Sequence, residues 1–305
     1  MKRAHIQLRP GTLWPALVNR SRHALGCGAM QPIATEQAFV DDQGIRFLVR
    51  KVSSLERKDE QRKRLEANQG EPHNPFLPYE QDLFVAHISA RHVAVLNKFN
   101  VIDHHLLIVT RQFEHQETLL SAEDFAALAA CLREFEGLGF YNGGLIAGAS
   151  QPHKHLQLVP LPLAEGPPGV PMEPAFDASR GTTSAGTISA FGFRNAFEYI
   201  VPEMFDDPLL AGVELRALYL EMLERVGLHG VPAAGTLCQS APYNLLLTRH
   251  WMLLVPRSRE RFESISVNAL GFAGSLFVRN DAQLERVKQV GPMAVLREVA
   301  FPAPA

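Results

Sequence analysis

The sequence has few cysteines, no excess charge of either sign and no long hydrophobic run. Its three cysteines, Cys27, Cys131 and Cys238, are too few and too far apart for a disulfide framework, which favours a reducing compartment. Lysine and arginine total 30 against 32 aspartates and glutamates, a formal net charge of -2, which argues against nucleic acid or an acidic membrane as partner. No window approaches about 18 uninterrupted apolar residues, so we expect no membrane span. No apolar core follows the basic start, which argues against a signal peptide and for a cytoplasmic protein.

What remains is an ordinary globular composition, with 46% hydrophobic and 20% charged residues over a length of 305 residues. Alternation of Ile45, Phe47 and Val49 predicts a strand. Two apolar runs at 93–96 and 106–110 predict buried strands on either side of residues 97–100. A further strand pair is expected at 144–147 and 155–161.

Two amphipathic helices are predicted between these strands. Ser121 and Asp124 have the spacing of a capping box, and the apolar spacing that follows predicts a helix that stops at Gly137. A second helix is expected to begin near Asp207 and to end at Gly230. Prolines and glycines between residues 160 and 192 argue against regular structure there, so we expect a long loop.

One pattern indicates an internal repeat. Asn97-Lys98-Phe99 followed by the apolar run up to Arg111 is echoed by Tyr243-Asn244-Leu245 followed by the run up to Arg257. Two diverged copies of one strand–helix unit would produce this echo.

The densest functional signal lies between residues 148 and 159. Because side chains of a strand alternate between its two faces, His153, His155 and Gln157 would share one face, with Leu156 and Leu158 on the other. Two imidazole rings and one amide on the same face are unsuited to a hydrophobic core and suited to lining a pocket.

This face suits nucleophilic attack on phosphorus. A neutral imidazole is a competent nucleophile near pH 7, and its attack on a phosphoryl group gives a phosphoramidate intermediate. Charge on the phosphoryl oxygens then needs donors, which Gln157, Ser150, Gln151 and the backbone amides of Gly148 and Ala149 can supply. Two other interpretations stay open at this point: zinc binding by the two histidines with help from His104-His105, and surface histidines on an edge strand.

The segment from Tyr141-Asn142-Gly143-Gly144 through Gln151-Pro152-His153-Lys154-His155-Leu156-Gln157 resembles the histidine-triad (HIT-like) superfamily. It is most similar to the ATP adenylyltransferases, the diadenosine tetraphosphate (Ap4A) phosphorylases. Gln157 replaces the third histidine of the short hydrolases, as in this transferase branch and the galactose-1-phosphate uridylyltransferases. Further stretches match in order between Ile45 and Arg279: 54–58, 97–99, 105–110, 243–248, 251–258 and 268–279.

The resemblance implies an α+β fold, with an antiparallel β-sheet, flanking helices and two diverged HIT-like halves in one chain. The expected divisions are an N-terminal extension (1–44), a half with the catalytic strand (45–165), a Pro/Gly-rich loop (166–192) and a second half (193–305).

The resemblance also implies roles for individual residues. His155 matches the nucleophile that carries AMP, Gln157 matches a contact to the reacting phosphate, and His153 is expected to orient His155. Arg279 stands where a lysine is expected, which keeps the cation and changes its geometry. The implied substrate contacts are Lys58, Asn97, Lys98, Asn142, Gly148, Ala149, Ser150, Gln151, Gln157, Asn268, Ala269, Leu270, Ser275 and Arg279.

The implied activity is reversible phosphorolysis of Ap4A by phosphate to ATP and ADP. Adenylyl sulfate, which shares the AMP half, is an alternative donor that would give ADP and sulfate. A uridylyltransferase is disfavoured because the cysteine pair of many such enzymes is missing, and a nucleotide-binding regulator without turnover is a more distant alternative. No cofactor is firmly implied, no dedicated metal site is indicated, and Mg²⁺ would accompany the polyphosphate as its counter-ion.

Overall fold

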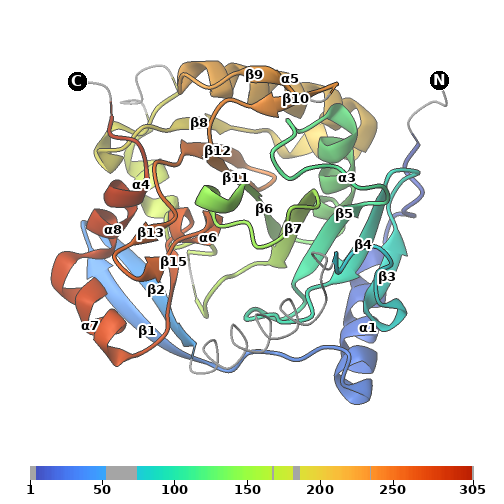
Figure 1. Cartoon of the computed structure of the whole chain (residues 1–305), viewed down its shortest axis with the longest axis horizontal. Helices are drawn as coiled ribbons and strands as arrows, with labels where there is room; N and C mark the ends of the chain where they lie inside the picture. Colours follow the sequence, from blue (N-terminus) through green and yellow to red (C-terminus); the bar gives the residue numbers. More distant parts are fainter. Residues whose placement is uncertain (1–4, 53–73, 167, 181–185, 234, 304–305) are drawn as a thin grey trace.

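An eight-stranded antiparallel sheet runs through the middle of the molecule (Figure 1). The computed structural model describes residues 5–52, 74–166, 168–180, 186–233 and 235–303. The strand order is β3-β4-β5-β7-β6-β11-β12-β8, and every neighbouring pair is antiparallel. The strands are β3 (Phe84–His87), β4 (His92–Leu96), β5 (Leu106–Thr110), β6 (Gly137–Gly143), β7 (His155–Pro160), β8 (Ala196–Tyr199), β11 (Tyr243–Leu247) and β12 (Trp251–Pro256).

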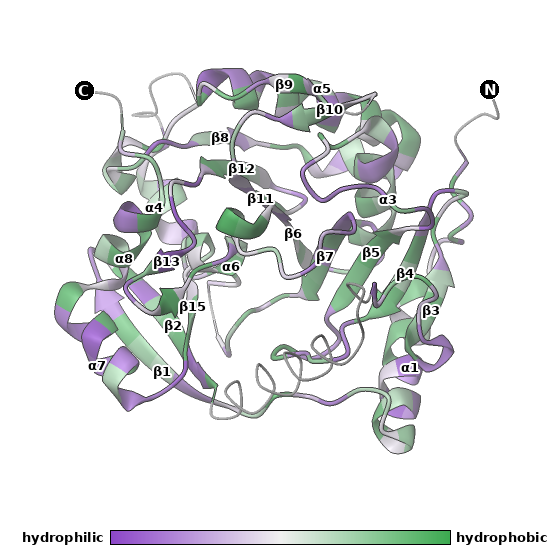
Figure 2. Cartoon of the chain, viewed as in Figure 1, coloured by the Kyte–Doolittle hydropathy of each residue, from purple (hydrophilic) through white to green (hydrophobic). Residues whose placement is uncertain are grey.

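One face of this sheet is covered by two helices, α3 (Ala122–Leu132) and α5 (Pro208–Arg225), which pack against each other. Strand alternation sends Leu156 and Leu245 into the core beneath these helices, while Leu246 and Val159 enter a separate core on the other face. Because both faces are buried, hydrophobic residues predominate along the central strands, which are largely green in Figure 2. At one end of the sheet, α1 (Leu13–Cys27) packs against β3 and the short turn η1 (Gln81–Leu83).

A three-stranded sheet closes the second core. In it β2 (Ile45–Val52) lies between β1 (Thr35–Asp42) and β15 (Ser275–Val278), and β15 runs parallel to β2. Phe47 and Val49 point into this core, which confirms the strand predicted at Ile45. The remaining elements are α4 (Glu173–Ala178), α6 (Ala269–Phe272), α7 (Asp281–Val290), α8 (Pro292–Val299), β9 (Gly230–Ala233), β10 (Thr236–Gln239), β13 (Arg261–Phe262), β14 (Ile265–Ser266), η2 (Leu145–Ala147), η3 (Ser189–Phe191) and η4 (Pro202–Asp206).

Within the described parts of the chain, no helix has the length and apolar character needed to cross a bilayer.

The predicted strands at 93–96, 106–110 and 155–161 are confirmed as β4, β5 and β7. The capping box is confirmed too, because the Ser121 hydroxyl accepts from the Asp124 amide while the Asp124 carboxylate accepts from the Ser121 amide. The predicted end of this helix at Gly137 is wrong, since α3 ends at Leu132. Gly137 instead begins β6, where an added Cβ would lie 2.8 Å from a methyl carbon of Leu158.

Three further expectations need correction. Residues 144–147 do not form a strand, because the positive φ of Gly144 turns the chain into η2. The second helix ends at Arg225, and Gly230 begins β9. The 160–192 segment contains α4 and η3, and Pro174 is tolerated in the first turn of α4, where a helix needs no amide donor.

The central pair of strands has a symmetric register. Asn142 of β6 pairs with Asn244 of β11, Tyr141 pairs with Leu245, and Gly143 pairs with Tyr243. In the sheet, the pair β6–β7 on one side of the centre therefore corresponds to the pair β11–β12 on the other. The echo in the sequence pairs β11–β12 with a different segment, residues 97–111, which contains β5. The division into two diverged halves stays a prediction.

Beneath β7 lies a buried cluster of charged groups that connects the sheet to α3. The Lys154 Nζ is 3.0 Å from Asp124 Oδ2 and donates to the Leu119 carbonyl, while Asp124 Oδ1 is 2.8 Å from His92 Nε2. Burial alone would raise the pKa of Asp124, but the His92 hydrogen bond and the Lys154 charge hold it well below its usual range. Asp124 is therefore ionised, and it needs its cation.

Replacing Lys154 by methionine should lower the free energy of unfolding by about 3–5 kcal/mol, because Asp124 would keep a buried charge without its partner. Urea denaturation measures this change. The matched control is Lys288→Met, which removes an exposed lysine that pairs with Glu285 on the surface of α7 and should change stability by less than about 1 kcal/mol. Equal small effects of the two variants would contradict the assignment.

Candidate active site

A glycine-rich turn after β6 is packed against the start of α6. Gly148 has a φ of +93°, and a Cβ added there would lie 2.8 Å from the Asn268 Cβ and 3.1 Å from the Val267 carbonyl oxygen. Only glycine permits this approach. The close packing brings the predicted 148–151 turn beside Asn268, whose side chain caps α6 by accepting from the Leu270 amide.

Asn142 links this turn to the sheet. Its Oδ1 accepts from the Ala269 amide at 2.9 Å and from Asn244 Nδ2 at 2.8 Å. The Asn244 amide also donates to the Ala147 carbonyl at 2.8 Å. Because these bonds occupy the Asn142 oxygen, its NH₂ group is directed away from them and can donate to a ligand.

Arg257 holds the Asn244 side chain in place. The side chain is 1% exposed, and it donates to Asn244 Oδ1 at 2.6 Å and to the carbonyls of Val267, Arg259 and Val299. Burial lowers its pKa to about 9, so the guanidinium is still charged at neutral pH. Its fork of donors therefore holds Asn244, and through it Asn142, in one orientation.

The backbone of His155 is held by a side chain. Gln116 accepts from the His155 amide at 2.9 Å, and its own amide donates to the carbonyls of His155 and Asn142. Continuing the β6–β7 register by two residues from the Phe140–Gln157 pair places Asn142 opposite His155. Gln116 thus bridges the two strands at the position where direct pairing stops.

The His155 ring presents one nitrogen for reaction. Its Nδ1 lies 2.8 Å from the His153 carbonyl oxygen and must donate to it, which leaves the lone pair on Nε2. The side chain is only 4% exposed, and the Phe76 ring lies 5.3 Å from the imidazole, centroid to centroid. Burial lowers the pKa of His155 to about 4, against a smaller raising effect of the backbone bond. At pH 7 the imidazole is neutral, the form that attacks an electrophile.

Gln157 is oriented by a chain of hydrogen bonds from β4 and β5. Asn97 Oδ1 accepts from the Phe99 amide, so its Nδ2 is the atom that faces His105 Nδ1 at 3.2 Å. Burial lowers the pKa of His105 to about 4, and this neutral ring then carries its proton on Nε2, 3.0 Å from Gln157 Oε1. The Gln157 oxygen is thereby occupied, and its NH₂ group is free to donate elsewhere.

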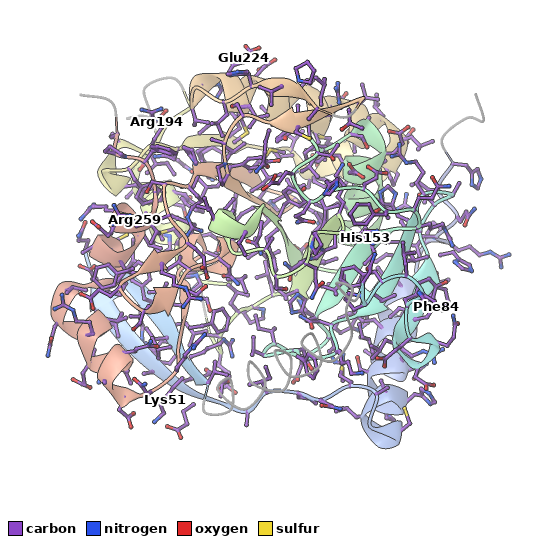
Figure 3. The ribbon with its side chains drawn as sticks, viewed as in Figure 1. Lys51, Phe84, His153, Arg194, Glu224 and Arg259 are labelled. Atoms are coloured by element: carbon purple, nitrogen blue, oxygen red, sulfur yellow. The ribbon has the colours of Figure 1, made fainter. Side chains whose placement is uncertain are left out.

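His153 is tied into the fold. Its Nε2 donates to the Thr110 carbonyl at 2.8 Å, and its Nδ1 accepts from Asn74 Nδ2 at 3.0 Å. The ring is 0% exposed and lies beside β5 and β7 in Figure 3. The structure thus places its carbonyl against His155 and commits its ring to Thr110 and Asn74. His153 precedes β7, and both of its ring nitrogens are bonded, so His153 and His155 do not form a zinc-binding pair in this arrangement.

The remaining residues predicted to contact substrate lie in several different parts of the chain. Lys98 follows Asn97 and pairs with Glu80. Ser275 begins β15, and its buried hydroxyl has no hydrogen-bond partner among the described residues. Arg279 follows β15, and its backbone amide donates to Gln283. Lys58, with the whole 54–58 stretch, lies outside the described residues.

Four residues of this site escaped prediction: Asn74, Gln116, Asn244 and Arg257 in their bracing roles. One signal was present for Asn244, which is a polar residue inside the fully buried strand Tyr243–Leu247. Buried Arg50 is a further case, because its Nε has no partner among the described residues. The β2–β15 register places Arg50 beside Phe277 and Ser275 beside Leu48, so Arg50 and Ser275 share one face of the small sheet.

Comparisons with known proteins show which family the chain resembles over most of its length. Residues 3–178 match the Ap4A phosphorylase N-terminal domain, and residues 190–302 match the ATP adenylyltransferase C-terminal domain. The Saccharomyces cerevisiae protein APA1 is 25% identical over 96% of this chain and 95% of its own length. Diadenosine 5',5'''-P1,P4-tetraphosphate phosphorylase 2 from the same yeast is 26% identical over 71% of this chain and 72% of its own length.

Solved structures show the same fold. The crystal structure of yeast Ap4A phosphorylase Apa2 superposes with a TM-score of 0.76 at 21% identity, covering 98% of this chain and all of that one. The Apa2 complex with Ap4A gives a TM-score of 0.73 at 21% identity over 98% of this chain and 100% of that one. These matches confirm the α+β fold with its large antiparallel sheet. Since the two domain families together span most of the sequence, the chain belongs to the Ap4A phosphorylase/ATP adenylyltransferase family.

Proposed function

We propose that this protein is a nucleotidyltransferase that phosphorolyses Ap4A to ATP and ADP through an adenylyl group carried on His155. The observation that carries the proposal is the neutral His155 ring, with Nδ1 bound to a backbone carbonyl and Nε2 without a partner among the described residues. Gln157 on the same strand and Asn142 on neighbouring β6 present two amide donors beside it. The Apa2 structures with AMP and with Ap4A support nucleotide substrates for this chain.

In the first step, the His155 Nε2 lone pair attacks the α-phosphorus of the dinucleotide. An N–P bond forms, the bond to the bridging oxygen breaks, and ATP leaves with that oxygen and its electrons. Negative charge on the phosphoryl oxygens is met by the NH₂ groups of Gln157 and Asn142 and by donors of Gly148, Ala149, Ser150 and Gln151. His153 keeps the attacking ring in its tautomer through its carbonyl.

In the second step, an oxygen of inorganic phosphate attacks the adenylyl phosphorus. The N–P bond breaks, its electron pair returns to Nε2, and ADP is released. Both steps are reversible, so ATP and ADP would give Ap4A. Lys58, Lys98, Asn268, Ala269, Leu270, Ser275 and Arg279 are the proposed contacts to the nucleotide and its polyphosphate, and Mg²⁺ would arrive with the polyphosphate as its counter-ion.

The unpaired polar atoms of the small sheet support a phosphate-binding role there. The Ser275 hydroxyl and the Arg50 Nε are both buried without a described partner, and such groups favour an anionic ligand that can accept their hydrogen bonds. The proposal also keeps the expected division of the chain into an N-terminal extension, two halves and a loop between them, with boundaries at residues 45, 166 and 193.

Incubation with Ap4A labelled in its adenylyl phosphate, without inorganic phosphate, should leave an acid-labile label on the protein. His155→Asn should abolish this label while nucleotide binding is partly retained, because the nucleophile is lost and the donors are kept. Intact-protein mass spectrometry and filter binding measure the two effects. A label that persists in His155→Asn would overturn the assignment, and His250→Asn, an exposed histidine, is the control.

The donor is tested in the same assay by adding phosphate. Release of ATP and ADP from Ap4A supports the proposal. If adenylyl sulfate is consumed and Ap4A is not, the adenylyl-histidine chemistry stands and the proposed donor is wrong. If neither donor reacts and both bind, the chain is a nucleotide-binding protein without turnover.

Asn97→Asp should lower kcat by about 10²-fold, the usual cost of one lost oxyanion donor, with little change in nucleotide affinity. The introduced carboxylate would accept a proton from His105 Nδ1, which strips Nε2 of its hydrogen and forces Gln157 to turn its NH₂ toward the ring. Nitrogen NMR of His105 reports this tautomer change directly. An unchanged tautomer, or an equal loss of affinity and kcat, would contradict the hydrogen-bond chain.

The rate of adenylyl-enzyme formation in single turnover should be nearly constant from pH 8 down to pH 5. With a pKa of about 4, His155 stays neutral across this range. A histidine of ordinary pKa would lose about thirtyfold of its neutral form by pH 5. Phosphate is left out because its own ionisation near neutral pH would otherwise add to the pH dependence of the rate. A steep decline centred near pH 6.5 would show that the ring is not desolvated as described.

A further inference from the structure

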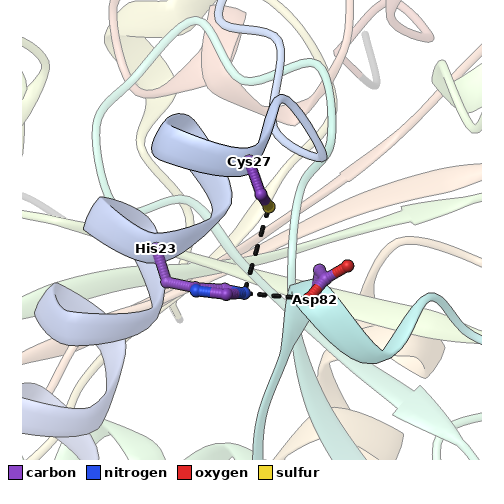
Figure 4. Close-up of side chains that lie close together, drawn as sticks. All are labelled: His23, Cys27 and Asp82. Atoms are coloured by element: carbon purple, nitrogen blue, oxygen red, sulfur yellow. Dashed lines mark hydrogen bonds and ion pairs between the residues drawn. The ribbon is translucent and has the colours of Figure 1, made fainter.

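Three potential metal ligands meet on the surface at the end of α1, away from the residues assigned above. His23 and Cys27 lie one turn apart on α1, and Asp82 reaches them from η1 (Figure 4). The His23 Nε2 is 2.8 Å from Asp82 Oδ1 and 3.9 Å from Cys27 Sγ, and one ligand atom from each residue lies within 4.8 Å of the others. All three side chains are exposed.

The chemistry of this set suits zinc. Imidazole, thiolate and carboxylate are the ligands that Zn²⁺ takes, at about 2.0–2.3 Å. Ligand atoms around a tetrahedral zinc lie about 3.2–3.7 Å apart, so small rotations of exposed side chains convert the present spacing into a coordination shell. The thiol does not suit Mg²⁺ or Ca²⁺, which prefer oxygen.

The helix that carries two of these ligands is firmly seated. Leu13, Leu17 and Ala24 of α1 are fully buried against the sheet end, so the helix is fixed in place. His23 and Cys27 are therefore held one turn apart on the side of the helix that meets η1. His23 also borders a surface cavity of about 380 Å³ that is lined by Arg20 and Val85 among others, which gives an ion a path to the site.

We propose that His23, Cys27 and Asp82 form a zinc-binding site that ties α1 to the segment covering the catalytic histidine. Binding would displace the proton of the Cys27 thiol into solvent. The His23 proton that now points at Asp82 would move from Nε2 to Nδ1 by exchange with solvent, so that the His23–Asp82 hydrogen bond is replaced by two metal–ligand bonds. With three protein ligands, the fourth position is open to water.

The position of Asp82 connects the site to the active site. Residues 74–83 begin beside the histidines of the site and end in η1. Asn74 bonds the His153 ring, Phe76 packs on His155, and Glu80 pairs with Lys98. A metal that holds Asp82 against α1 therefore restrains one end of a segment whose other end contacts His155. Zinc would reduce local opening of this segment.

Cobalt(II) is the probe, because a cysteine thiolate bound to it gives an intense charge-transfer absorption that oxygen and nitrogen ligands do not give. The full-length protein, reduced and freed of metal, should bind one cobalt ion with this absorption, and zinc should displace it. Cys27→Ser should remove the absorption, and Asp82→Asn should weaken cobalt binding by about 10- to 100-fold. Cys238→Ser, at the other cysteine that is not fully buried, should leave both unchanged.

Absence of the absorption, or its persistence in Cys27→Ser, overturns the site. Hydrogen–deuterium exchange tests the connection: zinc should slow exchange in peptides covering residues 74–83 in the unaltered protein and not in Cys27→Ser. Metal binding without this slowing would reject the restraint on the segment. Neither readout depends on turnover, so failure of the proposed nucleotidyl transfer would not change the outcome.

Discussion

The hydrogen bond from His155 Nδ1 to the His153 carbonyl is the constraint on which the site depends. It fixes which ring nitrogen is basic, and it works only because the ring is buried and neutral. The surrounding side chains maintain this state: Gln116 holds the His155 backbone, Phe76 excludes water from the ring, and Thr110 keeps His153 in place. A protonated His155 would lose its nucleophilic lone pair and be left with a buried charge, so reactivity and burial require the same protonation state.

The sheet places different residues at corresponding positions on its two sides. In β12, Val255 pairs with Asn244, which matches the position of His155 opposite Asn142 on the other side. Two residues further along, the Arg257 backbone amide donates to the Pro242 carbonyl. Arg257 thus corresponds in register to Gln157. The side of β6 has the proposed nucleophile His155 and the proposed donor Gln157, and the side of β11 has an aliphatic residue and a buried arginine that holds Asn244. One side of the sheet has the proposed reactive groups, and the other fixes the orientation of the Asn244 amide that bonds Asn142 across the central strand pair.

Much of this architecture could be predicted from local pattern. Strand alternation located β7 and separated His155 and Gln157 from Leu156, and the capping box located the start of α3. Helix ends were harder, because Gly137 and Gly230 are glycines for close packing within strands and not for helix termination. Among the bracing residues, Asn244 left a signal as a polar residue in an apolar strand. Asn74, Gln116 and Arg257 left none, since a polar side chain bonded to a group distant in the sequence leaves no periodic pattern. Lys58 lies outside the described residues, so its expected role is still a prediction.

A nearly neutral chain can bind a polyphosphate if its donors are local and prearranged. A formal net charge of -2 provides no long-range attraction for an anion. At the reacting phosphorus, the proposed donors are amide NH₂ groups whose oxygens are already occupied, in Asn142 and Gln157, together with backbone amides at Gly148. The proposed cationic contacts, Lys58, Lys98 and Arg279, are assigned to the rest of the polyphosphate. Neutral donors of fixed orientation stabilise charge where it develops during transfer, and they hold a released anion less tightly than buried cations would. The proposed reversible transfer between polyphosphates of similar charge would need this balance, because each product must leave as readily as it forms.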